Sequence, residues 1–166
     1  MPSEMTSSII APATLRDYTR PSLILPRLHQ RDTAGVINEL SQALQRQGCV
    51  PDFLPFYHAA LNQELLAHSG GENGLAFPHA RLSAVKHLQF ALGRSPEPLA
   101  WGAKSSARVD LVFLLAVPAT DAASYLHLLA SLARLGRQPE LLQELRAAPD
   151  AEAILALLAS MKLRPG

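Results

Sequence analysis

The segment from Val109 to Val117 constrains the fold of this chain most. Apolar residues occupy both sets of alternate positions along it, and Asp110 is its only charged residue. A strand with two apolar faces has to be covered on both sides, which is typical of the centre of a sheet in an α/β protein. The segment therefore predicts an α/β fold in which helices cover both faces of one sheet.

The rest of the chain divides into helical and strand-like segments around that central strand. Apolar residues at helical spacing, with capping residues before them, predict helices over residues 32–47, 52–70, 120–135, 139–147 and 150–161. Short apolar or alternating runs predict strands over residues 22–25, 75–77 and 87–94, the first at a sheet edge because Pro26 ends it. Residues 1–21 carry three prolines and no clear period, so we interpret them as a mobile N-terminal extension of a single domain over residues 22–162.

Composition excludes several other classes of protein. The 166 residues suit one domain, and a hydrophobic content of 48% argues against disorder along most of the chain. A formal net charge of +1 without a Lys/Arg run argues against nucleic acid as the main partner. The longest apolar uncharged run, Leu111 to Ala119, is too short to span a bilayer, and no signal peptide pattern opens the chain. We therefore expect a cytoplasmic protein without membrane insertion.

Metal and disulfide chemistry find no support in the sequence. Cys49 is the single cysteine, so it has no partner for an internal disulfide, and no C-x-x-C spacing exists for zinc. His29, His58 and His87 lack a partner at a metal-ligand spacing on one helix. We expect neither a metal site nor a cofactor.

One short segment carries the candidate chemistry. Asn73 and the neighbouring glycines predict a turn, a short strand follows, and Pro78 fixes the backbone ahead of His79. A histidine on a loop just past a strand end is placed for exposure rather than for packing. Because neutral imidazole is available as a nucleophile at physiological pH, we interpret His79 as a candidate nucleophile.

This segment and the central strand together resemble a known family. The run Gly74-Leu75-Ala76-Phe77-Pro78-His79, with residues 109–115 and Pro118, is similar to enzyme IIA of the phosphotransferase system, in the fructose/mannitol class that includes the nitrogen-regulatory IIA proteins. The resemblance extends from about Leu23 to about Ala159 and implies a mixed β-sheet covered by helices on both faces. It also implies that His79 accepts a phosphoryl group from the carrier HPr or its nitrogen-branch relative. The recipient would then be a IIB unit, unless the protein acts as a phosphorylation-dependent regulator of a target protein.

The sequence departs from that family at two positions that assist the histidine. The family commonly has an arginine sixteen residues before the phosphorylated histidine, where this chain has Gln63. It has a second active-site histidine seven residues after the proline that corresponds to Pro118, where this chain has Tyr125. His127 lies two residues further along the predicted helix, a rotation of roughly 200°, so it should point away from the site.

Other residues near the motif partly replace the family's arginine and second histidine. Gln63 and Tyr125 donate hydrogen bonds without charge, and charge-assisted bonds are about twice as strong as neutral ones. Arg81 and His68 supply positive potential, and the pair His68-Ser69 stands where the family often has Ser-Thr. The resemblance thus implies a site made of His79 with lining residues Gln63, His68, Ser69, Arg81 and Tyr125.

Three interpretations of function follow from these residues. The first is a working phosphoryl acceptor with an altered pocket, serving relay or regulation. The second is a degenerate, non-catalytic IIA-like module that acts by binding a partner. The third, more remote, is a small-molecule-binding domain in the same fold.

Overall fold

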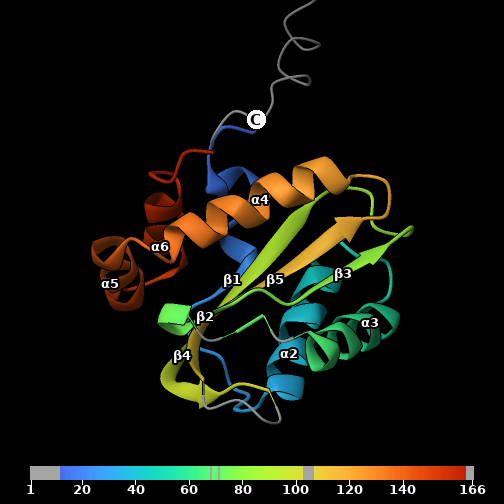
Figure 1. Cartoon of the computed structure of the whole chain (residues 1–166), viewed down its shortest axis with the longest axis horizontal. Coiled ribbons are helices and arrows are strands. Elements are labelled where there is room, and N and C mark those ends of the chain that lie inside the picture. Colours follow the sequence, from blue (N-terminus) through green and yellow to red (C-terminus); the bar gives the residue numbers. More distant parts are fainter. Residues whose placement is uncertain (1–11, 68, 71, 103–106, 164–166) are drawn as a thin grey trace, which may run out of the picture.

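A computed structural model describes residues 12–67, 69–70, 72–102 and 107–163 of the chain (Figure 1). Within these residues, five strands form one sheet in the order β1-β4-β5-β2, and β3 also pairs with β5. The strands are β1 (Ile24–Leu25), β2 (Leu75–Ala76), β3 (His79–Leu82), β4 (Gln89–Ala100) and β5 (Arg108–Pro118). Strand β4 runs antiparallel to β5, while β2 and β3 run parallel to β5 and β1 runs parallel to β4, so the sheet is mixed.

Five α-helices cover the sheet on its two faces (Figure 1). Helices α2 and α3 pack on one face, and α4, α5 and α6 pack on the other. Their bounds are Thr33–Arg46, Phe53–Leu66, Ala122–Leu135, Pro139–Ala147 and Ala151–Leu158. The α/β fold with a mixed sheet between helices is confirmed. None of the helices in the described residues is both long and apolar enough to cross a bilayer.

Strand β5 is the central strand that the sequence predicts, and from Leu111 to Val117 its side chains alternate between two apolar cores. One core lies under α4, α5 and α6, and the other lies under α2 and α3. The first takes Leu111, Phe113, Leu115 and Val117 from β5, and the second takes Val109, Val112, Leu114 and Ala116. This two-sided burial explains why the segment carries apolar residues at nearly every position.

Aspartates begin four of these helices, as the sequence predicts. The carboxylates of Asp32, Asp52, Asp121 and Asp150 accept hydrogen bonds from backbone N–H groups in the first turns of α2, α3, α4 and α6. These bonds satisfy donors that a helix N-terminus leaves free. Helices α3 and α6 end earlier than predicted, and α3 stops at Leu66 because Ala67 adopts extended backbone angles.

The segment before residue 22 differs from our expectation of an extension. Leu15 and Tyr18 lie in a short 3₁₀ helix, η1 (Leu15–Tyr18), and both side chains are buried in the core with α6. The Leu15 N–H donates to the carbonyl of Met161 at 3.1 Å, and the Leu163 N–H donates to the carbonyl of Ala13 at 2.9 Å. The packed part of the chain therefore includes residues 13–21. Residues 1–11 of the expected extension lie outside the described residues.

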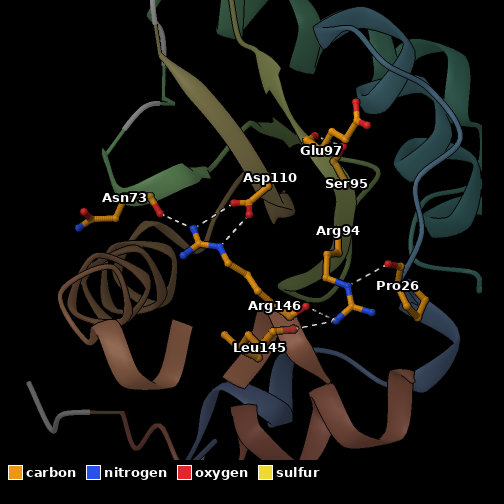
Figure 2. Close-up of polar contacts among 8 residues, drawn as sticks. All are labelled: Pro26, Asn73, Arg94, Ser95, Glu97, Asp110, Leu145 and Arg146. Atoms are coloured by element: carbon orange, nitrogen blue, oxygen red, sulfur yellow. Dashed lines mark hydrogen bonds and ion pairs between the residues drawn. The ribbon is translucent and has the colours of Figure 1, made fainter. Parts of the chain in front are cut away.

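Arg94 ties strand β4 to the C-terminal end of α5 (Figure 2). One of its terminal nitrogens donates to the carbonyls of Leu145 and Ala148, each at 2.8 Å, and its Nε donates to the carbonyl of Pro26 at 3.0 Å. The last carbonyls of a helix have no partner within the helix, so a guanidinium is a strong substitute. Arg94 thus joins three segments that are far apart in the sequence.

Asp110 of β5 pairs with Arg146 of α5 beside Arg94 (Figure 2). Two guanidinium nitrogens of Arg146 lie 2.7 and 3.0 Å from the two carboxylate oxygens of Asp110, a bidentate geometry. Arg146 also donates to the carbonyl of Asn73, which lies just before β2. Asp110 therefore has a structural role: it connects β5 and α5 with the turn that leads toward His79.

We predict that Arg94→Ala lowers the free energy of unfolding by about 3 kcal/mol, because several buried or half-buried carbonyls lose a charged donor at once. Urea denaturation measures the change. The matched control is Arg31→Ala, whose guanidinium lies 3.6 Å from Glu97 with 66% of its side chain exposed. An exposed pair of this kind contributes little, so this variant should stay within about 0.5 kcal/mol of the parent. Equal effects of the two variants would contradict the assigned role of Arg94.

Candidate functional site

The chain around His79 forms two short strands, β2 and β3, which pair with the same edge of β5 and are separated by a short break. Leu75 pairs with Leu111 and His79 pairs with Leu115, so β2 and β3 keep the same register along β5. Between them, the carbonyl of Pro78 accepts a hydrogen bond from the N–H of Leu115 at 2.9 Å. His79 is thus the first residue of β3 and half-buried, rather than a loop residue as we predicted. The chain returns to the sheet directly after Pro78, which explains the difference.

The two ring nitrogens of His79 face different groups. Nδ1 lies 3.4 Å from the carbonyl oxygen of Phe77, and Nε2 lies 3.3 Å from the hydroxyl of Tyr125. A carbonyl only accepts, so this contact favours the tautomer of the neutral ring that has its proton on Nδ1 and its lone pair on Nε2. The Tyr125 hydroxyl then donates to Nε2, and its ring tilts against the imidazole with centroids 5.2 Å apart.

Arg81 supplies positive charge on the same side of the strand. It lies two residues after His79 in β3, so the two side chains leave the same face. Its guanidinium donates to the carbonyl of Ala119 at 3.0 Å, just before helix α4, which carries Tyr125. Burial raises the pKa of Tyr125, while the Arg81 guanidinium acts in the opposite sense. The raised pKa keeps the Tyr125 hydroxyl protonated and able to donate at neutral pH.

Ser69 makes its hydrogen bonds to Glu64 and Phe77 and none to the imidazole in the described residues. Its hydroxyl donates to Oε1 of Glu64 at 2.7 Å, and its oxygen accepts from the N–H of Phe77 at 2.9 Å. Oε2 of Glu64 accepts from the Ser69 N–H at 2.7 Å and from Nε1 of Trp101 at 2.8 Å. The structure thus connects Ser69 with the segment that carries His79, through the backbone of Phe77.

Glu64 and Trp101 are residues that our sequence analysis missed. Glu64 is 1% exposed, whereas the apolar side chain of Leu65 next to it is 50% exposed. The signal was present, because Glu64 lies four residues after Ala60 and eight after Phe56, both of which are buried. An acidic residue at helical spacing in an apolar stripe is a candidate for a buried, hydrogen-bonded carboxylate.

The other predicted site residues differ in where they lie. Gln63 is exposed at the C-terminal end of α3, and in the described part of the chain its side chain makes no hydrogen bond. His68 lies outside the described residues. His127 is exposed on α4, in agreement with the predicted rotation away from the site. The structure therefore brings His79, Tyr125 and Arg81 together, with Ser69 behind them.

Metal ligation is not indicated by the arrangement of side chains. In the residues that the structure describes, no group of three or more His, Cys, Asp or Glu side chains is positioned to hold a metal ion.

The sequence model of one family covers nearly the whole of this arrangement. The family described as phosphoenolpyruvate-dependent sugar phosphotransferase system, EIIA 2, matches residues 17–161. The chain belongs to this family. The resemblance derived from the Pro78-His79 segment and the central strand is thus confirmed, and the matched range includes His79, Arg81 and Tyr125.

Individual relatives agree with this assignment. A nitrogen regulatory protein of Bradyrhizobium diazoefficiens is 31% identical over 146 residues, which cover 87% of this chain and 94% of the relative. The crystal structure of a nitrogen regulatory protein IIA from Neisseria meningitidis superposes with a TM-score of 0.74 at 25% identity, covering 87% of this chain and 98% of that one. A complex of mannitol enzyme IIA with phosphorylated mannitol enzyme IIB from Escherichia coli shares the fold, with a TM-score of 0.73 at 18% identity over 86% of this chain and 99% of that one.

We predict that Arg81→Ala raises the pKa of Tyr125 further, because the guanidinium stabilises the tyrosinate anion and its loss removes that stabilisation. The change in tyrosinate absorbance on alkaline titration measures this, with Tyr125→Phe used to subtract the other tyrosines. Arg108→Ala is the control, since Arg108 is an exposed arginine at the opposite end of β5 from Pro118, after which α4 begins. A shift of the same size in both variants would show that Arg81 acts only through net charge.

Proposed function

We propose that this protein is a phosphoryl-accepting IIA protein of the phosphotransferase system, of the nitrogen-regulatory kind, acting in the cytoplasm. In this proposal an HPr-like carrier phosphorylates His79 on Nε2. The observation that carries the proposal is the environment of the imidazole: the Phe77 carbonyl faces Nδ1, and Nε2 keeps its lone pair on the side of Tyr125 and Arg81. Family membership and the likeness to nitrogen regulatory proteins support it.

The chemical step needs no group beyond the carrier and this histidine. The Nε2 lone pair attacks the phosphorus of the carrier's phosphohistidine, and the bond between phosphorus and the carrier's nitrogen breaks as that nitrogen takes back its electron pair. Nδ1 of His79 keeps its proton and directs it at the Phe77 carbonyl. The phosphoryl group carries roughly two negative charges, which Arg81 is placed to offset.

Tyr125 changes its partner during this step. In the resting protein its hydroxyl donates to Nε2, the atom that must attack. The hydroxyl therefore leaves the nitrogen as phosphorus approaches, and a phosphoryl oxygen is the new acceptor within its reach. A donor that follows the charge from the nucleophile to the transferred group stabilises the product more than the reactant.

Two fates of the phosphoryl group are open. It passes to a IIB unit, or it stays on His79 and phosphorylation itself is the signal. The names of the relatives matched by sequence favour regulation, because those matched over most of their own length include several nitrogen regulatory proteins. A regulator of this kind would bind a target protein in only one phosphorylation state. The mannitol complex with a phosphorylated IIB unit supports the IIB alternative by fold alone.

A second candidate function is a non-catalytic IIA-like binding module. The observation in its favour is that the hydroxyl of Tyr125 occupies the lone pair of Nε2, while Gln63 and Tyr125 carry no charge where the family commonly has an arginine and a second histidine. In this alternative the site keeps its shape and the protein acts by contact alone.

Incubation with phosphoenolpyruvate, enzyme I and HPr or its nitrogen-branch relative tests the proposal by intact mass. We expect an acid-labile gain of one phosphoryl group in the parent protein and none in His79→Ala, because Nε2 of His79 is the proposed acceptor atom. If a control IIA protein is labelled and this one is not, the acceptor function is wrong. The binding module then predicts that a partner is recovered equally with the parent and with His79→Ala.

Gln63→Arg should raise the initial rate of phosphorylation about fivefold. A charged donor stabilises a phosphoryl group by about 1 kcal/mol more than a neutral donor does. The initial slope of the same mass assay measures the change. Gln42→Arg adds the same charge at an exposed position on α2 and should leave the rate unchanged. A gain in both variants would mean that the added charge attracts the carrier without reaching the site.

A further inference from the structure

A continuous chain of hydrogen bonds connects a buried carboxylate with the ring of His79. Glu64 accepts from the hydroxyl of Ser69 at 2.7 Å, and the oxygen of that hydroxyl accepts from the N–H of Phe77 at 2.9 Å. The carbonyl of Phe77 lies 3.4 Å from Nδ1 of His79. The last distance is long, as is common for catalytic contacts before the ligand is bound.

The carboxylate fixes the direction of the two bonds made by the Ser69 hydroxyl. An ionised carboxylate only accepts, so the Ser69 hydroxyl has to donate its one proton to Glu64. Its oxygen is then free only to accept, and the Phe77 N–H is the donor it receives. The carbonyl of Phe77 also only accepts, so the ring has to present a protonated Nδ1. The carbonyl thus favours the tautomer of His79 in which Nε2 holds the lone pair, and the bonds from Glu64 through Ser69 hold Phe77 in place.

The backbone of Phe77 is available for this purpose because it faces away from β5, whereas the carbonyl of the next residue, Pro78, faces β5 and accepts from Leu115. β2 and β3 keep one register along β5, and Phe77 and Pro78 are the two residues between them. Pro78 has no N–H to contribute to the ladder. The N–H and carbonyl of Phe77 belong to different peptide units, so the chain acts by fixing the position of this residue and not by passing charge through it.

The burial of Glu64 is not explained by packing. Helix α3 exposes Leu66 by 83% and Leu65 by 50%, while it buries a carboxylate to 1%. Burying a charged group costs several kcal/mol unless its hydrogen bonds are met, whereas a leucine at the same position would pack at no such cost. Trp101 closes the pocket: its Nε1 donates to Glu64, and its ring lies so near Gly70 that an added Cβ there would meet it at 2.4 Å.

We propose that Glu64 is a positioning residue for His79, which acts through the Ser69 hydroxyl and the Phe77 backbone to hold the imidazole in its Nδ1–H form. This inference rests on the proposed function, because a fixed tautomer matters only if Nε2 is the nucleophile. Free histidine in water prefers the opposite tautomer, in which Nε2 carries the proton and cannot attack. The chain from Glu64 therefore prepares the reactive form before a carrier arrives.

The test reads the tautomer directly. Nitrogen-15 NMR of the imidazole, at a pH where the ring is neutral, distinguishes Nδ1–H from Nε2–H, and His79→Ala identifies the resonances of His79. We expect Ser69→Ala to shift His79 from Nδ1–H toward Nε2–H. The same variant should slow phosphorylation about threefold to tenfold, the value of one hydrogen bond. Ser69→Thr keeps a hydroxyl and should restore both readouts.

Ser41→Ala is the matched control, because it makes the same change at another buried serine. The Ser41 side chain lies in α2 at 0% exposure, and its hydroxyl has no hydrogen-bond partner in the described part of the chain. It should leave both the tautomer and the rate at their parent values. Glu64→Gln is the direct variant and should shift the tautomer in the same sense as Ser69→Ala. In this variant an amide N–H replaces one carboxylate oxygen, so two donors face each other at one of the three hydrogen bonds and the protein is less stable. Ser69→Ala avoids this problem and therefore provides an independent test.

An unchanged tautomer in Ser69→Ala, or an equal shift in Ser41→Ala, overturns the positioning role. The tautomer is measured without any carrier, so this result is separate from the acceptor assay. A tautomer that depends on Ser69 in a protein that is never phosphorylated would refute the acceptor function and retain the chain from Glu64. If the protein is phosphorylated and Ser69→Ala leaves the tautomer of His79 unchanged, the acceptor function is retained and the positioning role of Glu64 is refuted.

Discussion

The pairing of β5 with strands on both of its edges is the constraint on which the rest of the structure depends. β4 lies along one edge, and the short strands β2 and β3 share the other. Because both faces of β5 are buried as well, its position leaves little freedom to the elements around it. The two-residue strand β2 and the four-residue strand β3 have little stability of their own, so their place is set by the ladder with β5.

The candidate site is a consequence of that ladder at the point where it is broken. Backbone N–H and C=O groups of successive residues in a strand point alternately to its two edges. Pro78 faces β5, where its carbonyl accepts from Leu115, so the backbone groups of Phe77 face the opposite edge. Phe77 is therefore free to bind Ser69 with its N–H and to face His79 with its carbonyl. The rigidity of β5 is what makes such a short break a defined geometry.

The sequence predicts those features that are determined by residues close to one another along the chain. The central strand and the aspartate caps follow from apolar alternation and from side-chain chemistry within a few residues, and both were confirmed. The loop assignment of His79 was wrong because residues 79–82 alternate between polar and apolar over only four positions directly after Pro78, and it is the pairing with β5 that makes them a strand. Leu15 gave no signal either, since its burial depends on contact with Met161 at the other end of the chain.

The site residues also divide into those identified from neighbouring residues and those that depend on distant contacts. Recognition of the Pro78-His79 segment identified the family, but the partners of His79 come from elsewhere in the chain: Tyr125 from α4 and, through Phe77, Glu64 from α3. Helical spacing alone could have marked Glu64 as buried, because it shares a face with Phe56 and Ala60. Its three hydrogen-bond donors could not be foreseen, since Trp101 belongs to a segment beyond β4.

The distribution of charge around His79 bears on what phosphorylation would achieve here. Where the family commonly has an arginine and a second histidine, this chain has the neutral side chains of Gln63 and Tyr125, and the cation that remains close is Arg81 on the strand of His79 itself. A neutral donor in place of a charged one stabilises a phosphoryl group less by about 1 kcal/mol, which is about fivefold in an equilibrium. Under the proposed function, the phosphorylated form of this protein would lose its group more readily to a recipient than one in a fully cationic pocket. A less stable phosphohistidine suits a protein whose state has to follow the supply of phosphoryl groups.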